Sequence, residues 1–168
     1  IGIIAFAISG AIVAIKKRFD LFGIIVLGVI TAVGGGALRD IILGIIPPTM
    51  FKNSLYVFVA FLTSCIAFGA AAVAAVKFKK NKQFFIDAVN FFDAIGLGVF
   101  AVTGTNTAII NGFEHNAFLA IFVGVITGIG GGMMRDILAG KVPFVLYKDI
   151  YASAAIVGAA MYYYMYSY

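Results

Sequence analysis

The feature that most constrains this chain is a triple glycine followed by an arginine and an aspartate inside an apolar segment, and it occurs twice. The first copy reads TAVGGGALRDIILG and the second TGIGGGMMRDILAG. A glycine costs about 1 kcal/mol relative to alanine inside a helix, and charged groups are costly in apolar surroundings. Because the chain carries both costly features twice, we expect the glycine triplets and the charged residues to have a structural or functional role. The residues are Gly34, Gly35, Gly36, Arg39 and Asp40 in the first copy and Gly130, Gly131, Gly132, Arg135 and Asp136 in the second.

The two copies belong to a longer internal repeat. Gly130 lies 96 residues after Gly34, and with this offset 15 of the 31 positions from Phe22 to Lys52 are identical to those from Phe118 to Lys148. The alignment extends weakly backwards and places Gly2 on Gly98, Ala5 on Ala101 and Ser9 on Thr105. We therefore expect two structurally equivalent halves.

Composition places both halves in a membrane. The chain is 63% hydrophobic and 11% charged, and its mean hydropathy is +1.10. A soluble domain is about a quarter charged, so this chain lacks the polar surface that a soluble fold needs. An open strand edge is not tolerated in lipid. We expect an all-α membrane protein.

Six apolar segments are long enough, or nearly so, to cross about 30 Å of hydrocarbon as helices. The stretch FFIDAVNFF at 84–92 is amphipathic, and it either lies at the membrane interface or extends the next helix. We expect a first three-span repeat at 1–76, a basic cytoplasmic loop with an interfacial stretch at 77–92, and a second three-span repeat at 93–168. The expected spans are about 1–15, 21–46, 54–76, 93–110, 117–140 and 145–166.

The loops between spans predict the orientation. Three basic residues follow the first span and four follow the third, whereas the second and fourth loops carry one and none. Basic loops stay in the cytoplasm, so we expect the N-terminus outside. Because each repeat holds an odd number of spans, the second copy enters the membrane from the opposite side. Such inverted repeats are typical of transport proteins.

Two interpretations of the glycine triplets stay open. Small residues let helices approach closely in membranes, which would make the triplets packing sites. Alternatively, each triplet breaks its helix and frees carbonyl groups that line a water-filled path. Three successive glycines exceed the usual packing pattern, and we favour the broken helix.

The Arg-Asp pairs also allow two interpretations. Residues next to each other in a helix point about 100° apart, so we do not expect Arg39 to pair easily with Asp40, or Arg135 with Asp136. These residues either line a pathway or lie at helix ends, where their side chains reach the interface. Asp93, at the start of the fourth span, either faces the pathway or is a charge at the N-terminus of that helix, and we favour the helix charge.

Hydroxyl groups within the spans are further candidates for a pathway. For each of them, a bond to the helix's own backbone is the simpler expectation. The candidate pore hydroxyls are Ser9, Thr31, Thr105 and Thr127, and Thr103 and Thr107 lie in the same spans.

Several other functions are disfavoured. Cys65 and His115 are the only residues of their types, so no disulfide framework and no thiol or histidine metal cluster is expected. The net charge of +5 follows from basic loops and does not indicate nucleic-acid binding. No catalytic constellation and no cofactor motif is present, so we expect neither an enzyme nor a cofactor.

The glycine motifs, together with FAISGA in the first span and GLGVFAVTGTNTA in the fourth, resemble the prokaryotic trimeric intracellular cation (TRIC) channels, some of them formerly labelled glycine transporters. The resemblance covers the whole chain. It implies a seven-span subunit built from two inverted repeats and a last helix. Because six spans are expected here, we expect the seventh helix to be missing or truncated. It also implies a homotrimer with one pore in each subunit.

By this resemblance, the glycine triplets are kinks in the pore helices, and the Arg-Asp residues lie beside the pore. The conducted ions are monovalent cations, chiefly potassium, and no other metal is implied. We expect a multi-pass protein of the bacterial inner (plasma) membrane whose partners are these ions, the lipid bilayer and its own copies. The alternative is a secondary transporter for a small neutral solute such as glycine, because inverted repeats serve both activities.

Overall fold

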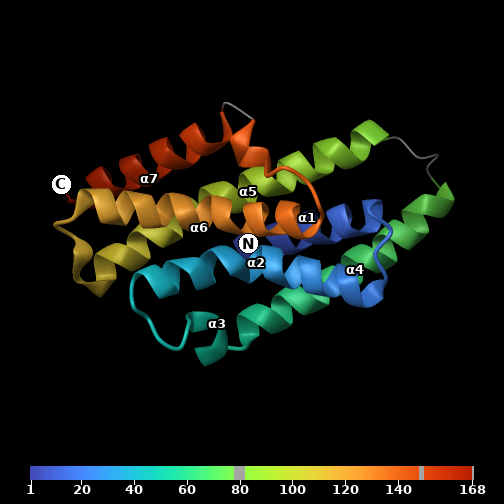
Figure 1. Ribbon diagram of the computed structural model, residues 1–168, viewed down its shortest axis with the longest axis horizontal. Coiled ribbons are helices and arrows are strands. Elements are labelled where there is room, and N and C mark those ends of the chain that lie inside the picture. The colour runs from blue at the N-terminus through green and yellow to red at the C-terminus, as the bar shows by residue number, and fades with distance from the viewer. Residues whose placement is uncertain (78–81, 148–149, 168) are drawn as a thin grey trace.

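The computed structural model describes residues 1–77, 82–147 and 150–167, and these form helices joined by short turns (Figure 1). The predicted all-α architecture is confirmed for these residues. Lys79 and Lys80, on which part of the predicted orientation rests, lie outside them, as does Lys148 at the end of the repeated segment. The elements are α1 (Gly2–Lys16), α2 (Leu21–Ile42), α3 (Thr49–Lys52), α4 (Leu55–Lys77), α5 (Lys82–Ala108), the π-helix η1 (Ile109–Phe113), α6 (Ala117–Leu138), the 3₁₀ turn η2 (Phe144–Leu146) and α7 (Tyr151–Ser167).

The six long helices occur where the six apolar segments predicted them, and the differences are local. The second helix ends at Ile42 rather than near 46, and the short α3 follows it. The fourth predicted span corresponds to α5, which begins at Lys82 rather than near 93. The stretch 84–92 is therefore part of this helix. Within the described residues, three helices are long and apolar enough to span a membrane, and two shorter apolar helices accompany them: Leu21–Ile42, Gln83–Phe113 and Ala117–Leu138, then Gly2–Lys16 and Leu55–Ala71.

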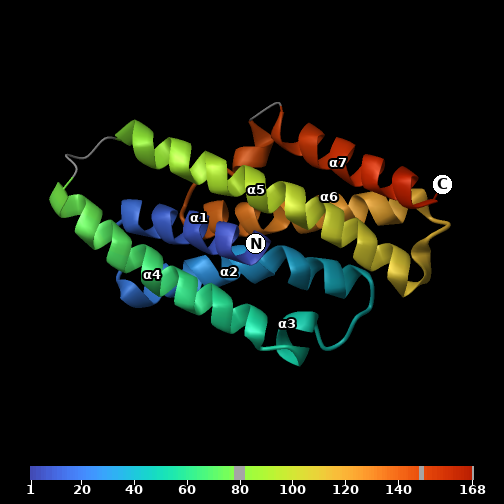
Figure 2. The same cartoon turned by 180° about the vertical axis from the view of Figure 1, so that it is seen from behind.

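The helices form two groups of three. α1, α2 and α4 contact one another, and so do α5, α6 and α7. The groups meet where α2 lies against α6 and α1 against α5. In Figures 1 and 2, α4 and α7 lie on opposite sides of this central layer.

α2 and α6 are matched from end to end. Asp20 caps the first turn of α2 by accepting a hydrogen bond from the Gly23 amide at 2.7 Å. Asn116, 96 residues later, caps α6 through the Leu119 amide at 3.0 Å. A side-chain oxygen at this position satisfies a backbone donor that the helix leaves unpaired.

The C-terminal turns match as well. Gly44 and Gly140 both have a left-handed backbone, with φ of +69° and +63°. In each case the following amide returns to the aspartate carbonyl of the motif, at 2.8 Å from Ile45 to Asp40 and 2.9 Å from Lys141 to Asp136. This turn places the next segment beside the helix end.

Alanine at either of these turn glycines is expected to destabilise the protein by about 1 kcal/mol, because an L side chain is strained at positive φ. No atom of the described residues lies within 4 Å of the added methyl group at either site, so crowding does not contribute. Thermal unfolding of Gly140→Ala in detergent measures the effect. Gly69→Ala on α4, with equally open space and no positive φ, is the control and should not lose stability.

The glycine triplets lie where α2 and α6 cross. The two helices run antiparallel in Figure 1. A methyl group on Gly35 would overlap the carbonyl oxygen of Thr127, and one on Gly131 would overlap that of Thr31. The two contacts are exchanged by the 96-residue offset, so the crossing has a local two-fold symmetry. Both helices remain α-helical through their triplets.

The predicted helix break with freed carbonyl groups is therefore wrong in this structure. The backbone hydrogen-bond pattern of the helix continues through the glycines, and the missing side chains let two backbones touch. The packing interpretation accounts for Gly35 and Gly131.

The backward extension of the repeat is also corrected. A methyl group on Gly10 would lie 2.6 Å from the Thr31 hydroxyl, and one on Gly104 would lie 2.5 Å from that of Thr127. Gly10 thus corresponds to Gly104, an offset of 94 rather than 96. With the same offset Ser9 corresponds to Thr103, not Thr105. The link from α5 to α6 is two residues longer and includes the π-helix η1, which shifts the register.

Candidate functional site

Each Arg-Asp pair forms a fork at the end of its helix. Arg39 donates from Nε and Nη2 to the Asp40 Oδ1, at 2.8 and 2.7 Å. Arg135 does the same to the Asp136 Oδ1, at 2.9 Å for both nitrogens. The prediction that neighbours 100° apart would not pair is wrong, because the long arginine side chain bends back along the helix surface to reach the carboxylate.

The second carboxylate oxygen holds the segment after the helix. Asp40 Oδ2 accepts a hydrogen bond from the Thr49 amide at 2.6 Å, and Asp136 Oδ2 accepts one from the Phe144 amide at 2.9 Å. The aspartate of the motif is thus fixed between its arginine and the returning chain. Because the aspartate both pairs with the arginine and anchors the segment after the helix, an arginine and an aspartate occur together in both repeats.

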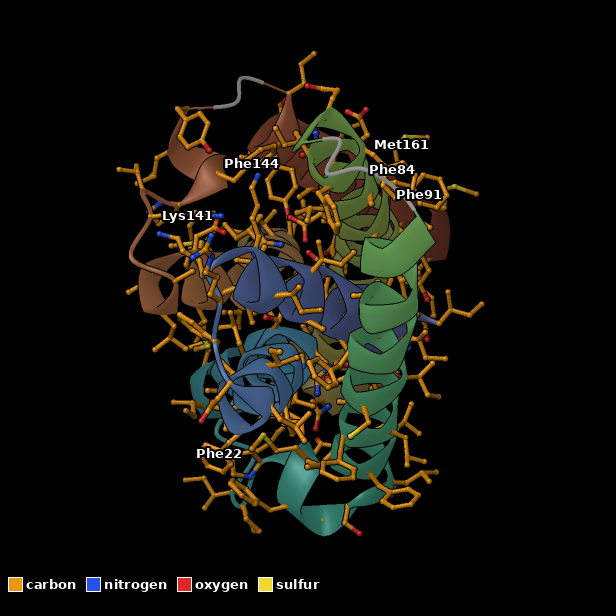
Figure 3. The ribbon with its side chains drawn as sticks, turned by 90° about the vertical axis from the view of Figure 1, so that its right-hand side faces the viewer. Phe22, Phe84, Phe91, Lys141, Phe144 and Met161 are labelled. Carbon is orange, nitrogen blue, oxygen red and sulfur yellow. The ribbon has the colours of Figure 1, made fainter. Side chains whose placement is uncertain are left out.

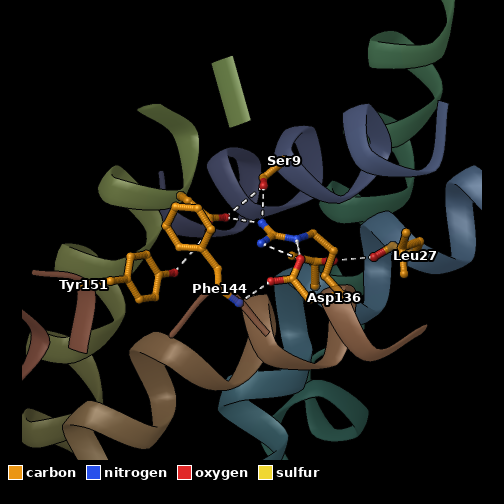
Figure 4. A network of polar contacts seen from close by, with 8 residues as sticks. Ser9, Leu27, Asp136, Phe144 and Tyr151 are labelled. Atoms are coloured by element: carbon orange, nitrogen blue, oxygen red, sulfur yellow. Dashed lines mark hydrogen bonds and ion pairs between the residues drawn. The ribbon is translucent and has the colours of Figure 1, made fainter. Parts of the chain in front are cut away.

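Among the described residues, the arginine of the second fork has further partners and that of the first has none. The Arg135 Nη1 donates to Ser9 Oγ at 2.5 Å and also to Asp93 Oδ1. Ser9 itself donates to Asp93 Oδ1 at 2.8 Å, and the Tyr151 hydroxyl donates to Asp93 Oδ2 at 3.2 Å. Figure 4 shows how α1, α5, α6 and α7 each contribute to this network.

This network is buried. Arg135, Asp93 and Ser9 are each no more than 2% exposed. A buried guanidinium is tolerated only when paired carboxylates and hydrogen bonds replace its hydration. Two carboxylates do so here, and together they close the space between the helices.

The role of Asp93 differs from the prediction. It was expected at the start of the fourth span, but α5 begins at Lys82, so Asp93 lies inside the helix and pairs with Arg135. Sequence reasoning also missed Tyr151. The available signal was a lone carboxylate in an apolar span, since such groups usually pair with one another.

The first fork, by contrast, faces a cavity of about 520 Å³. The cavity follows α2 from Arg39 and Asp40 past Gly36 to Ala32. The Arg39 side chain is 14% exposed, against 2% for that of Arg135. The other walls of the cavity come from α1, α3, α4, α5 and η1. α5 contributes Thr103 and Thr107, and η1 contributes Asn111.

Gly36 and Gly132 show the same asymmetry between matched positions. A methyl group on Gly132 would meet the Tyr151 hydroxyl at 3.3 Å and Asp93 Oδ2 at 3.6 Å. A methyl group on Gly36 would meet only its own Arg39, at 3.7 Å. The space beside α2 is open where the space beside α6 is filled by the polar network.

The four predicted pore hydroxyls do not line the cavity. Thr31, Thr105 and Thr127 are fully buried, and each donates to the carbonyl four residues earlier, at 2.6 to 2.9 Å. The simpler expectation of a backbone bond is confirmed for these three. Ser9 is the exception, because its hydroxyl belongs to the Arg135 network.

Basic residues gather at the end of the bundle near the filled side. Lys141 follows α6, and Ala139 packs against the end of α1 and the start of α2. Burial lowers the pKa of the Lys141 ammonium, Asp136 opposes this effect, and Lys16 and Lys17 add to it. Figure 3 looks onto this end, where Phe22, Phe84 and Phe91 are exposed.

No group of three or more His, Cys, Asp and Glu side chains could hold a metal ion within the described residues. The titratable groups at the site are instead paired with arginine, tyrosine or backbone amides. Its chemistry is therefore that of fixed charges and dipoles around a cavity.

The family model described as glycine transporter matches residues 1–72 and 90–167. A UPF0126 membrane protein of Deinococcus radiodurans is 41% identical over 161 residues, which cover 95% of this chain and 70% of the relative. The UPF0126 inner membrane protein YadS of Escherichia coli K12 is 40% identical and is covered to 72% of its length.

Two solved structures are similar over 99% of this chain. One is the TRIC trimeric intracellular cation channel orthologue from Rhodobacter sphaeroides, with a TM-score of 0.87, 34% identity and 80% of that chain covered. The other is a prokaryotic TRIC channel crystallised in 0.5 M KCl, with a TM-score of 0.89, 36% identity and 81% covered. The chain therefore belongs to the glycine transporter (UPF0126) family of membrane proteins, which includes the prokaryotic TRIC channels.

Proposed function

We propose that this chain is a subunit of a membrane channel for monovalent cations, potassium foremost, with a pathway inside each subunit of a homotrimer. The observation that carries the proposal is the asymmetry between the matched forks. The cavity beside Arg39 extends along α2 past Gly36 to Ala32, whereas the equivalent space beside Arg135 is filled. This arrangement is expected of a pathway that is open on one side of its centre and closed on the other.

The two similar solved structures support this function, since both are described as TRIC channels and one as a cation channel. We further propose that residues 1–76 and 93–168 are repeats of opposite orientation in the bacterial inner membrane. The antiparallel α2 and α6 and their exchanged contacts support this. The basic residues near Lys141 would face the cytoplasm and the N-terminus the outside.

The glycine triplets and the Arg-Asp forks keep proposed roles in this pathway. Gly36 and Arg39 border the cavity, and we place them on the route of the ion. Gly132 and Arg135 lie at the closed side, so opening there requires the network around Asp93 to separate. Gly35 and Gly131 fix the crossing between the two sides.

A second function, carriage of a small neutral solute such as glycine, is favoured by the description of the family model. Inverted repeats around a central site suit carriers as well as channels. The cavity of about 520 Å³ is large enough for such a solute.

Flux from proteoliposomes separates the two functions. We expect purified protein to release potassium down its gradient, and labelled glycine to enter no faster than in empty liposomes. Saturable glycine uptake without potassium release would contradict the channel and establish the carrier. Liposomes with protein denatured before reconstitution serve as the control for leakage.

A further inference from the structure

The cavity wall formed by α5 and η1 carries three polar side chains. Thr103, Thr107 and Asn111 follow one another at intervals of four residues, and all three line the cavity. Four residues advance an α-helix by about 6 Å and nearly complete one turn. Thr103 and Thr107 thus lie in a row along the axis of α5, and Asn111 follows them in the π-helix η1 at its end.

Each of these three side chains donates a hydrogen bond to the carbonyl four residues earlier in the chain. Thr103 donates to the Val99 carbonyl at 2.9 Å, and Thr107 donates to the Thr103 carbonyl at 2.7 Å. The Asn111 amide nitrogen donates to the Thr107 carbonyl at 2.7 Å. A hydroxyl has one proton and two lone pairs, and an amide oxygen only accepts. Since each threonine proton is used within the helix, the two hydroxyl oxygens can only accept, as can the amide oxygen of Asn111, and all three belong to side chains that line the cavity.

From this geometry we infer that Thr103, Thr107 and Asn111 form a row of oxygen ligands for a partly dehydrated monovalent cation. The inference rests on the proposed channel function and names the residues that the ion meets in the cavity. Oxygen dipoles that replace part of the hydration shell let an ion enter without binding it too tightly to leave.

The charge on the α2 wall is compatible with this role. Arg39 faces the same cavity, but Asp40 lies 2.7 Å from its Nη2 and balances its charge. The uncharged side-chain oxygens of Thr103, Thr107 and Asn111 then determine which ion is favoured. The corresponding residue to Thr103 in the first repeat is Ser9, whose hydroxyl is occupied by Arg135 and Asp93. The matched hydroxyl on the filled side is therefore already engaged.

The test is single-channel recording of the full-length protein in planar bilayers with potassium. Valine has nearly the shape of threonine but lacks the oxygen. We expect the potassium conductance of the double variant Thr103→Val/Thr107→Val to be about fivefold lower than that of the wild type, because the loss of a polar interaction of ordinary strength has an effect of this size. Thr107→Ser keeps the oxygen and should retain the wild-type conductance.

Thr63→Val is the matched control. Thr63 lies on α4, donates to the Val59 carbonyl at 2.7 Å and is not part of the cavity wall. The Thr63→Val variant should therefore conduct potassium like the wild type. If the wild type conducts potassium and the double variant, with the same thermal stability, conducts equally well, the row of ligands is refuted and the channel stands. A wild-type protein without potassium current overturns the channel and, with it, the row.

Discussion

Alanine at Gly35 or Gly131 is expected to cause a larger loss of stability than alanine at the other glycines discussed above. A methyl group at either position overlaps a carbonyl oxygen of the opposite helix. A backbone carbonyl cannot turn aside as a flexible side chain can, so α2 and α6 must separate. Overpacking in a close-packed interior costs about 1–3 kcal/mol and sometimes more. We expect the upper part of this range, measured by thermal unfolding in detergent.

Gly98→Ala is the matched control for this prediction. Gly98 lies on α5 with no atom within 4 Å of an added methyl group, and alanine is favoured over glycine in a helix by up to about 1 kcal/mol. This variant should be as stable as the wild type or more so. If Gly35→Ala and Gly131→Ala melt like Gly98→Ala, the backbones do not touch at the crossing, and the packing account of the triplets fails.

The second large effect is expected at Arg135. Arg135→Gln leaves the carboxylates of Asp93 and Asp136 buried without their common cation. Removing one partner of a buried ion pair typically costs about 3–5 kcal/mol, because the remaining charge has lost its compensation. We expect a loss of this size.

Arg39→Gln is the comparison that the repeat provides. The change removes the same group from the matched position, but it leaves only Asp40, which keeps its hydrogen bond from the Thr49 amide. Arg39 also borders the cavity, where water can solvate the remaining carboxylate. Thermal unfolding should therefore show a clearly smaller loss for Arg39→Gln. Equal losses would mean that the network around Asp93 adds nothing to the fork.

Much of the fold could be predicted from the sequence, because two simple signals carry it. Apolar runs separated by charged or proline-containing turns located all six long helices. Identity at a constant offset linked α2 to α6, down to the caps at Asp20 and Asn116. The errors lie at helix ends: apolar residues continue past Ile42, where the left-handed Gly44 ends the helix.

Less of the candidate site could be predicted. The partner of Asp93 is Arg135, 42 residues away, and only the packing of α5 against α6 brings the two together. The glycine triplets gave no local sign of whether a helix breaks or meets another backbone. The π-helix after α5 shifted the register of the repeat by two residues, which hid the correspondence between Ser9 and Thr103.

In the proposed function, ions cross this protein through a continuous pathway. A voltage-clamped planar bilayer with purified protein and a potassium gradient measures this passage. We expect discrete current steps that reverse near the potassium equilibrium potential and are not altered by glycine. A bilayer without current steps, from protein whose liposomes accumulate glycine in a saturable manner, would contradict it.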